Sequence, residues 1–316
     1  MVRTKRNTTA TDDTIAPQPG RRLRPVAHLR ARAAQRYSFE LFPPRDEAQQ
    51  LALESSLEKL LPLDPEYFSV TFGAGGSTFG PTLETVRTLL TAYRTPCAPH
   101  LSCGARIAEI DALLDTYRDL GVRRIVALRG DHPERRGHRE LRQAADLVGH
   151  IRRRLGDKIA IEVACYPEFH PESLDPGNEL RYFKIKVDAG ASGALTQYFF
   201  NADAYFRFVD DAAALGIAIP IVPGIMPVTN FARLARFSAL CGAEIPRWML
   251  KRLESYGNDG AAVRAFGEEV VTRLCERLLA GGAPGLHFYT LNRANATLKL
   301  WRNLGLPMAR KRQSAH

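Results

Sequence analysis

Short apolar segments alternate with longer amphipathic segments along most of the chain. The apolar segments are six to eight residues long and rich in β-branched and aromatic side chains. Segments of this kind, bounded by glycine, proline or polar residues, predict buried β-strands. We therefore predict strands at residues 37–42, 67–72, 97–103, 124–129, 159–166, 194–200, 218–224 and 286–291.

The amphipathic segments between these strands predict α-helices, because their apolar residues recur at three- and four-residue spacing. Several are followed by a glycine, such as Gly121, Gly190 and Gly216, which can take the left-handed conformation that ends a helix. The interval between the seventh and eighth strands is the longest and holds three such segments. Helices are predicted at residues 47–61, 83–93, 107–120, 140–155, 180–189, 202–215, 230–241, 247–253 and 261–280.

This order of elements favours an α/β fold, a (β/α)8 TIM barrel with extra helices between strands 7 and 8. An open doubly wound sheet is the alternative. Its dinucleotide-binding form would carry a G-x-G-x-x-G motif after the first strand, and this motif is absent. We assign the catalytic barrel to residues 37–307, a basic N-terminal extension to 1–36 and a basic tail to 308–316, and we expect both ends to be disordered.

The net charge of +10 would by itself indicate a nucleic-acid-binding protein. Residues 1–36 hold nine Lys or Arg against two Asp, and residues 310–312 add three cations, so the remaining body is about neutral. Basic tails of this kind are typical of solvated segments. We expect no specific nucleic-acid binding, although an organelle-targeting or RNA-contacting role of the N-terminal tail stays open.

Membrane and secretory signals are missing from the sequence. No apolar run approaches the roughly 18 residues of a membrane span, and the N-terminal segment lacks the apolar core of a secretory signal. The five cysteines form no C-x-x-C pair. They are typical of buried thiols in a reducing compartment, so we expect a cytoplasmic protein without disulfides that does not enter a membrane.

Polar residues stand at the carboxyl ends of seven of the eight predicted strands. From Glu40 to Gln197, successive members of this set are 29 to 35 residues apart. In a barrel the strand ends meet at one face, which is the face that carries the active site. The set consists of Glu40, Thr71, His100, Arg129 with Asp131, Tyr166, Gln197, and Asn292 with Arg293.

Two carboxylates of this set occupy different surroundings. Glu40 lies between Phe39 and Leu41, so burial should raise its pKa and keep a proton available for general acid catalysis. Pairing of Glu40 with a cation such as Arg293 is the alternative. Asp131 follows Arg129 closely and is expected to stay ionised. Carboxylates in such different surroundings can divide the acid and electrostatic roles.

Three other features bear on the chemistry. The glycine-rich segment 73–77 is not a Walker loop, because no Gly-Lys-Ser/Thr follows; it fits either a planar ligand or a plain turn. The histidines lack the spacing of a metal cluster, so no metal site is predicted. Lys184 and Lys186 fall in a predicted helix rather than a strand, which disfavours a Schiff-base mechanism.

Nine short motifs resemble those of the methylenetetrahydrofolate reductase family, in its bacterial type consisting of the catalytic barrel. They occur in order and extend over most of residues 37–307, and each lies at or beside a predicted strand end. The motifs are SFELFPPR at 38–45, VTFGAGGS at 70–77, APHL at 98–101, ALRGD at 127–131, YPEFHPE at 166–172, KVDAGA at 186–191, TQYFF at 196–200, PGIMP at 223–227 and HFYTLNR at 287–293.

The resemblance implies a cofactor and a reaction. It implies non-covalently bound FAD and reduction of 5,10-methylenetetrahydrofolate to 5-methyltetrahydrofolate by NADH or NADPH. The two substrates would react in turn, in a ping-pong sequence that belongs to one-carbon and methionine metabolism. A homo-oligomer is also expected.

The resemblance assigns Glu40 as the general acid that protonates the folate nitrogen, and Asp131 as a carboxylate near the flavin and the pterin. Phe231 resembles the aromatic residue on which either substrate stacks. The chain departs from the family pattern at Phe72 and Gln143, where relatives carry tyrosine. The implied flavin contacts are Thr71, Phe72, Ala74, His100, Arg129, Gly130, Asp131, Ala144, Tyr166, His170, Glu179 and Lys186, and the implied substrate contacts are Gln197, Phe231, Tyr289 and Arg293.

Two other functions stay open from the sequence. One is another FAD-dependent TIM-barrel oxidoreductase, similar to proline dehydrogenase, whose substrate would need a cationic clamp for its carboxylate. The other is a nucleic-acid-binding protein on an inactive barrel, which only the basic tails favour.

Overall fold

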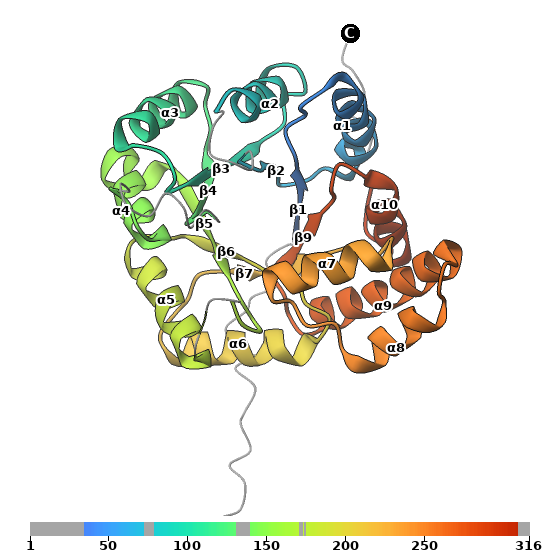
Figure 1. Ribbon diagram of the computed structural model, residues 1–316. Helices are drawn as coiled ribbons and strands as arrows, with labels where there is room; N and C mark the ends of the chain where they lie inside the picture. The colour runs from blue at the N-terminus through green and yellow to red at the C-terminus, as the bar shows by residue number, and fades with distance from the viewer. Residues whose placement is uncertain (1–34, 73–78, 131–139, 171–172, 174, 309–316) are drawn as a thin grey trace, which may run out of the picture. The chain divides into compact units, whose positions relative to one another are not determined.

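Nine strands form the centre of the structure, a computed structural model that describes residues 35–72, 79–130, 140–170, 173 and 175–308. Neighbouring strands pair in parallel, in the order β7–β6–β5–β4–β3–β2–β1–β9–β8. Figure 1 shows the strands gathered inside a ring of helices. The strands are β1 Arg36–Leu41, β2 Tyr67–Val70, β3 Cys97–Ser102, β4 Arg124–Leu128, β5 Ala160–Cys165, β6 Gly193–Thr196, β7 Ile221–Val222, β8 Gly224–Ile225 and β9 Gly285–Tyr289.

β7 and β8 together occupy the seventh strand position. β7 pairs with β6, β8 pairs with β9, and Pro223 separates the two short strands. Proline has no amide hydrogen and so interrupts the ladder, while its carbonyl oxygen still accepts a hydrogen bond of 3.0 Å from the amide of His287. The sheet thus returns to β1 through β9, and the predicted (β/α)8 barrel is confirmed.

Ten α-helices surround the strands in the described part of the chain (Figure 1). They are α1 Glu47–Leu60, α2 Phe79–Thr91, α3 Ile107–Asp119, α4 Ala144–Leu155, α5 Pro176–Asp188, α6 Ala202–Ala214, α7 Phe231–Cys241, α8 Arg247–Ser255, α9 Gly260–Ala280 and α10 Ala294–Asn303. The extra helices predicted between the seventh and eighth strands are present as α7 and α8, ahead of α9. None of these ten helices has both the length and the apolar character of a membrane span.

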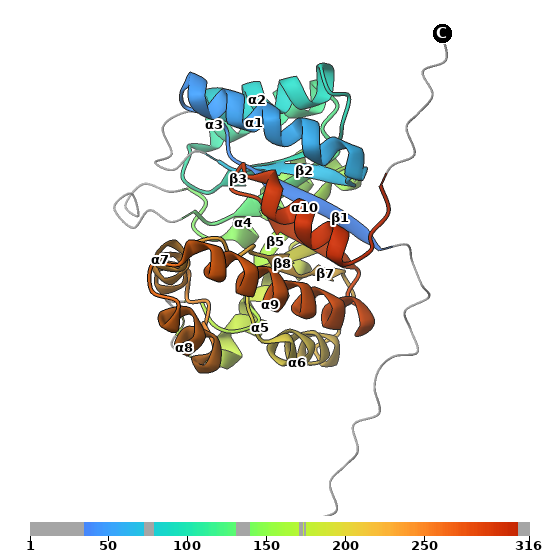
Figure 2. The same ribbon diagram turned by 90° about the vertical axis from the view of Figure 1, so that its right-hand side faces the viewer.

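The sequence prediction lacks α10, which follows the last strand. Its buried residues Ala294, Thr297, Leu300 and Trp301 do recur at helical spacing. The segment is only 10 residues long, and the side chain of Arg293 at its N-cap makes no capping hydrogen bond. A helix this short without a capping residue leaves a weak signal in the sequence, and its packing against α1 and α9 stabilises it instead (Figure 2).

The sheet separates two apolar clusters, because side chains alternate between its two faces along each strand. Phe39 and Phe68 belong to the large cluster between strands and helices. Tyr67, Val126 and Leu195 belong to a small cluster inside the barrel. The interior therefore holds little apolar volume, and it also takes up polar groups.

The amino ends of the strands carry an ion-pair network in which Glu162 is buried and Arg124 and Glu66 are partly buried. Arg124, the first residue of β4, donates hydrogen bonds to the carboxylates of Glu162 in β5 and Glu66. The Arg124 guanidinium also lies 4.6 Å from the ring centroid of Tyr67. Together these side chains close this end of the barrel. An active site is therefore expected at the opposite end of the barrel, where the strands have their carboxyl ends.

The five cysteines are free thiols. Four of them are buried and Cys241 is partly buried. The predicted buried thiols are thus confirmed at four positions.

Candidate active site

The carboxyl ends of the strands carry a ring of polar side chains, which we call the rim. Glu40 and His100 lie inside β1 and β3, Tyr289 ends β9, and the other members follow directly after the strands that bear them. Parallel strands bring their carboxyl ends to one face of the barrel. The described rim residues are Glu40, Thr71, His100, Arg129, Tyr166, Gln197 and Tyr289; Asn292 and Arg293 of the predicted set lie in the segment between β9 and α10.

Glu40 is a buried acid without a cationic partner. β1 lies between β2 and β9, so that Glu40 is in register with Ser69 and Tyr289, and the residue is 8% exposed. Burial raises the pKa of its carboxyl to about 8. No Lys or Arg of the described residues lies within ion-pair distance of Glu40, and the alternative pairing with the exposed Arg293 is not seen. Glu40 is therefore protonated at neutral pH.

His100 faces this acid from β3. Its Nε2 atom is 3.6 Å from Glu40 Oε2, slightly too far for a hydrogen bond. Burial lowers the pKa of the His100 imidazole to about 4. Both groups are thus neutral near pH 7, and their contact is not a salt bridge. The pair offers one transferable proton at a buried position.

A loop after β9 fixes the backbone around Glu40. Thr290 Oγ1 donates a hydrogen bond of 2.5 Å to the carbonyl oxygen of Glu40. The side-chain amide of Asn292 bonds to both backbone groups of Phe42, at 2.9 and 2.8 Å. Leu291 and Asn292 have positive φ angles of 50° and 54°, a conformation that costs free energy in residues other than glycine. Tertiary contacts therefore hold this loop in its tight turn.

The neighbouring rim positions on β9 and β6 are also held by hydrogen bonds. The Tyr289 hydroxyl donates to the carbonyl oxygen of Thr196 at 2.6 Å. The side-chain oxygen of Gln197 accepts from the amide of Tyr198 at 3.0 Å. These bonds leave the amide nitrogen of Gln197 without a hydrogen-bond partner among the described residues.

The opposite part of the rim combines aromatic and cationic groups. The rings of Tyr166 and His170 meet edge to face, with centroids 4.8 Å apart. Lys186, on α5, donates a hydrogen bond of 2.5 Å to the carbonyl oxygen of Ala164, and burial lowers the pKa of its amine. Gly130 has a positive φ angle of 82°, and a β-carbon there would lie 3.2 Å from Ser102 Cβ. Glycine thus keeps the backbone open at the end of β4.

The family profile of methylenetetrahydrofolate reductase matches residues 26–305, most of the chain. The chain belongs to the methylenetetrahydrofolate reductase family. The family resemblance of the nine motifs is thereby confirmed.

Curated relatives agree with this family assignment. A Pectobacterium carotovorum protein named 5,10-methylenetetrahydrofolate reductase is 38% identical over 270 residues, which are 85% of this chain and 90% of that protein. An Arabidopsis thaliana protein named methylenetetrahydrofolate reductase (NADH) 1 is 37% identical over 287 residues, 85% of this chain but 48% of that protein. The chain thus spans about half the length of the plant relatives that it matches.

A solved structure shares the fold. It is an uncharacterised protein from Clostridium thermocellum, described as binding two copies of 5-methyl-5,6,7,8-tetrahydrofolic acid. Its TM-score with this chain is 0.61, at 15% identity, and the match covers 87% of this chain and 96% of that protein. At this identity the likeness supports the barrel fold alone.

Several residues that the reductase family implies for the site lie at helix N-termini near the strand ends. Ala144 and Phe231 are the first residues of α4 and α7, and Glu179 lies in the first turn of α5. Ala74 and Asp131 lie outside the described residues. The structure therefore places most of the implied residues at one end of the barrel, and their contacts with ligands stay predictions.

Glu168, in the segment after β5, is a partly buried acid to which the sequence prediction gave no role. Its Oε2 atom accepts a hydrogen bond of 2.7 Å from the amide of Glu244, and burial raises its pKa to about 6. It therefore ties the loop after β5 to the segment after α7, the helix that begins with Phe231. An acid between Pro167 and an aromatic residue inside a reductase-like motif was the available signal.

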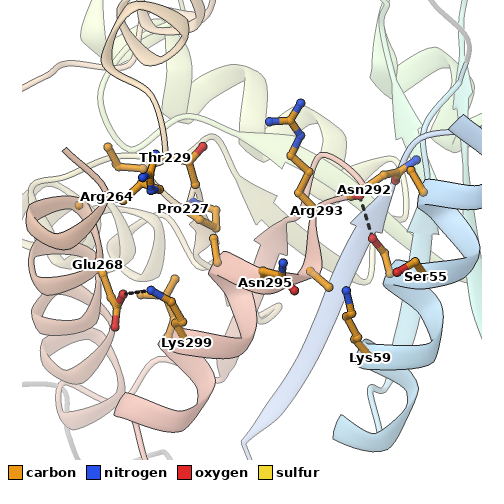
Figure 3. Close-up of a pocket in the computed structure, with 17 residues that line it drawn as sticks. Ser55, Lys59, Pro227, Thr229, Arg264, Glu268, Asn292, Arg293, Asn295 and Lys299 are labelled. Carbon is orange, nitrogen blue, oxygen red and sulfur yellow. Dashed lines mark hydrogen bonds and ion pairs between the residues drawn. The ribbon is translucent and has the colours of Figure 1, made fainter. Parts of the chain in front are cut away.

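A cavity of about 390 Å³ lies beside the rim, between α1, α9 and the start of α10 (Figure 3). Lys59, Arg264, Arg293 and Lys299 line it, and Glu268 is the one carboxylate among its described lining residues. Glu268 pairs with Lys299 at 3.1 Å. This charge distribution makes the cavity favourable for an anion.

Proposed function

We propose that the protein reduces 5,10-methylenetetrahydrofolate to 5-methyltetrahydrofolate, with NADH or NADPH as the reductant and FAD as the bound cofactor. The observation that supports this most directly is the buried, protonated Glu40 at the rim of a barrel of the methylenetetrahydrofolate reductase family. Such an acid has the protonation state that opening of the methylene bridge requires.

The residues at the ends of β2 to β5 fit a flavin. Lys186 and Arg129 supply positive charge, Tyr166 and His170 supply ring faces and edges, and Gly130 lets the backbone approach closely. Bound there, FAD would supply hydride transfer between the nicotinamide and the folate, with the two substrates reacting in turn. A dinucleotide with a flat ring system suits this combination of groups.

Glu40 would donate its proton to the folate nitrogen as the bond between that nitrogen and the bridging carbon breaks. The bridging carbon becomes part of an iminium group, which accepts the hydride and becomes the methyl group. The carboxylate left on Glu40 is then reprotonated by solvent. Asp131 is proposed to supply fixed negative charge beside the reacting rings.

The remaining contacts suit two substrates that share one face. Phe231 and Tyr289 offer ring faces to a pterin or a nicotinamide, and Gln197 offers an amide. Arg293 lines the cationic cavity, which would accept the carboxylate or phosphate end of either substrate (Figure 3). Both substrates are anions with flat rings, and the described residues match both properties.

An absorbance spectrum and two half-reactions test this function. The purified protein should show a flavin spectrum that NADH or NADPH bleaches without oxygen, and methylenetetrahydrofolate should restore it with formation of 5-methyltetrahydrofolate. A colourless protein that does not take up FAD would contradict the proposal. Oxidation of NADH with menadione, without any reaction with the folate, would instead favour another flavin-dependent oxidoreductase.

A further inference from the structure

The imidazole of His100 contains a buried polar atom that lacks a partner. Nε2 has no hydrogen bond to any described residue, and His100 is 7% exposed. Buried polar atoms without partners are rare in folded proteins, and each one needs a physical explanation. The nearby Glu40 Oε2, 3.6 Å away, provides one.

The surroundings keep charge away from this pair. Burial holds Tyr67 and Tyr289 protonated by raising their pKa, and it lowers the pKa of His287 to about 3, so these neighbours are neutral near pH 7. Among the described residues no Lys or Arg, including Arg129 and Lys186, forms an ion pair with Glu40. In the described surroundings His100 is thus the group placed to control which oxygen of Glu40 carries the proton.

Only one arrangement of the pair serves the proposed reaction. A carboxylic acid has one hydroxyl oxygen and one carbonyl oxygen. If Oε2 carried the proton toward His100, no proton would point to the substrate. If Nε2–H donates to Oε2 instead, the proton stays on Oε1, where a folate nitrogen can take it. A shift of a few tenths of an ångström brings the two atoms within hydrogen-bond distance.

We propose that His100 is a positioning residue that donates a hydrogen bond from Nε2 to Glu40 Oε2 and thereby keeps the acid proton on Oε1. This inference rests on the proposed function, in which Glu40 is the acid. It differs from the flavin contact that the family resemblance implies for His100. No electron transfer is involved: the Oε1 proton moves to the folate nitrogen, and the hydrogen bond to Oε2 stabilises the carboxylate that remains.

The test compares His100→Leu, which removes the donor, with His100→Gln, whose amide nitrogen can take the place of Nε2 and still donate. Each half-reaction is followed by stopped flow across pH. In His100→Leu the folate half-reaction should slow about tenfold or more. The pH above which its rate falls should rise by about one unit, because loss of the hydrogen bond destabilises the Glu40 carboxylate and raises the pKa of the acid. His100→Gln should recover most of the rate and restore the pH at which the rate begins to fall.

His287→Asn is the matched control, since His287 is a buried histidine in the same barrel that bonds to Ser38 instead of Glu40. In this variant the pH above which the folate half-reaction slows should be unchanged. If His100→Leu slows both half-reactions equally and leaves the pH dependence of the folate half-reaction unchanged, the proposal is overturned. His100 would then act as a flavin contact.

Infrared spectroscopy tests the hydrogen bond without any folate. The carbonyl band of protonated Glu40 is identified by its absence in Glu40→Gln. It should move to higher frequency in His100→Leu and return in His100→Gln. If the frequency of this band is the same in the wild type and both variants, the inference is overturned even in a protein that reduces the folate. If the band shifts but the protein does not reduce the folate, only the proposed function is overturned.

Discussion

Each end of the barrel holds a buried glutamate, and the two glutamates differ in whether a cation lies beside them. Glu162 at the amino end is 4% exposed and pairs with Arg124, whereas Glu40 at the carboxyl end is 8% exposed and faces a neutral imidazole. Burial raises the pKa of both carboxyls, and Arg124 pulls that of Glu162 back toward its ordinary value. Glu162 at the amino end thus takes part in a structural ion pair, whereas Glu40 at the carboxyl end retains a proton that it can donate.

This difference follows from the neighbours rather than from the depth of burial. A buried charge is tolerated when a partner of opposite charge and good geometry compensates it. Glu162 has such a partner, which Glu66 and the ring of Tyr67 also hold in place. Glu40 has none among the described residues, so its uncharged form is favoured. Perturbed acids of the second kind are typical of functional sites.

The largest expected effect is loss of folate reduction in Glu40→Gln. The amide keeps the shape of the side chain but has no acid proton, so the folate half-reaction should slow by a factor of about 10² to 10⁴. Reduction of the flavin by NADH needs no such proton and should be affected far less. Stopped-flow absorbance of the two half-reactions measures both. Losses of equal size in the two steps would show that Glu40 is not the acid.

Removal of the cation at the other end should cost stability instead. Arg124→Met leaves Glu162 as an uncompensated buried charge, and we expect the free energy of unfolding to fall by about 3–5 kcal/mol. Urea denaturation measures this loss. The loss should grow as pH rises above the ordinary pKa of glutamate. In this range Glu162 is ionised in the unfolded chain, whereas in the folded variant it must either keep a proton or carry an unpaired buried charge, and both cost stability.

The double variant Arg124→Met with Glu162→Gln is the control for this effect. Neutralising both partners should restore most of the lost stability, since no buried charge remains. A double variant as unstable as the single one would mean that packing of the Arg124 stem, rather than its charge, closes the amino end.

Gly193→Ala tests the space beside the paired glutamate. A β-carbon at Gly193 would overlap the Glu162 carboxylate, although the φ angle of Gly193 is an ordinary one. The carboxylate would have to move away from Arg124, and overpacking of this kind costs about 1–3 kcal/mol. Thermal unfolding measures the loss. Gly80→Ala, at a site where a β-carbon meets nothing within 4 Å, is the matched control and should not destabilise.

The sequence predicted the barrel and the position of its rim because both depend on local patterns. Each apolar run reports a strand, and Glu40, Tyr166 and Gln197 stand where those runs end. The predicted strands run too far at these ends: β6 ends at Thr196, and the apolar residues up to Phe200 are buried outside the ladder. Apolar sequence reports burial, and only backbone pairing defines a strand.

The features that the sequence did not predict depend on residues far apart in the chain. Asn292 bonds to Phe42 across 250 positions, and this contact exists only once β9 closes against β1. The pairing of Arg124 with Glu162 likewise requires the register of β4 against β5. Side-chain pairing across a closed barrel leaves no periodic pattern in the sequence.

The smallest expected effect is a pH dependence that only the carboxyl end should show. The folate half-reaction needs protonated Glu40, so its rate constant should be level below pH 8 and fall about tenfold per unit above it, following the pKa of about 8. The same proton affects stability. Because burial raises the pKa of Glu40 above its value in the unfolded chain, its contribution to stability is complete below the ordinary pKa of glutamate and disappears as pH rises to about 8. Glu40→Gln should therefore lose less unfolding free energy than the wild type over this pH range, as urea denaturation at several pH values would show. A folate half-reaction that stays level to pH 9 would mean that its rate does not depend on a Glu40 proton that is lost near pH 8, and Glu40 would then not be the acid.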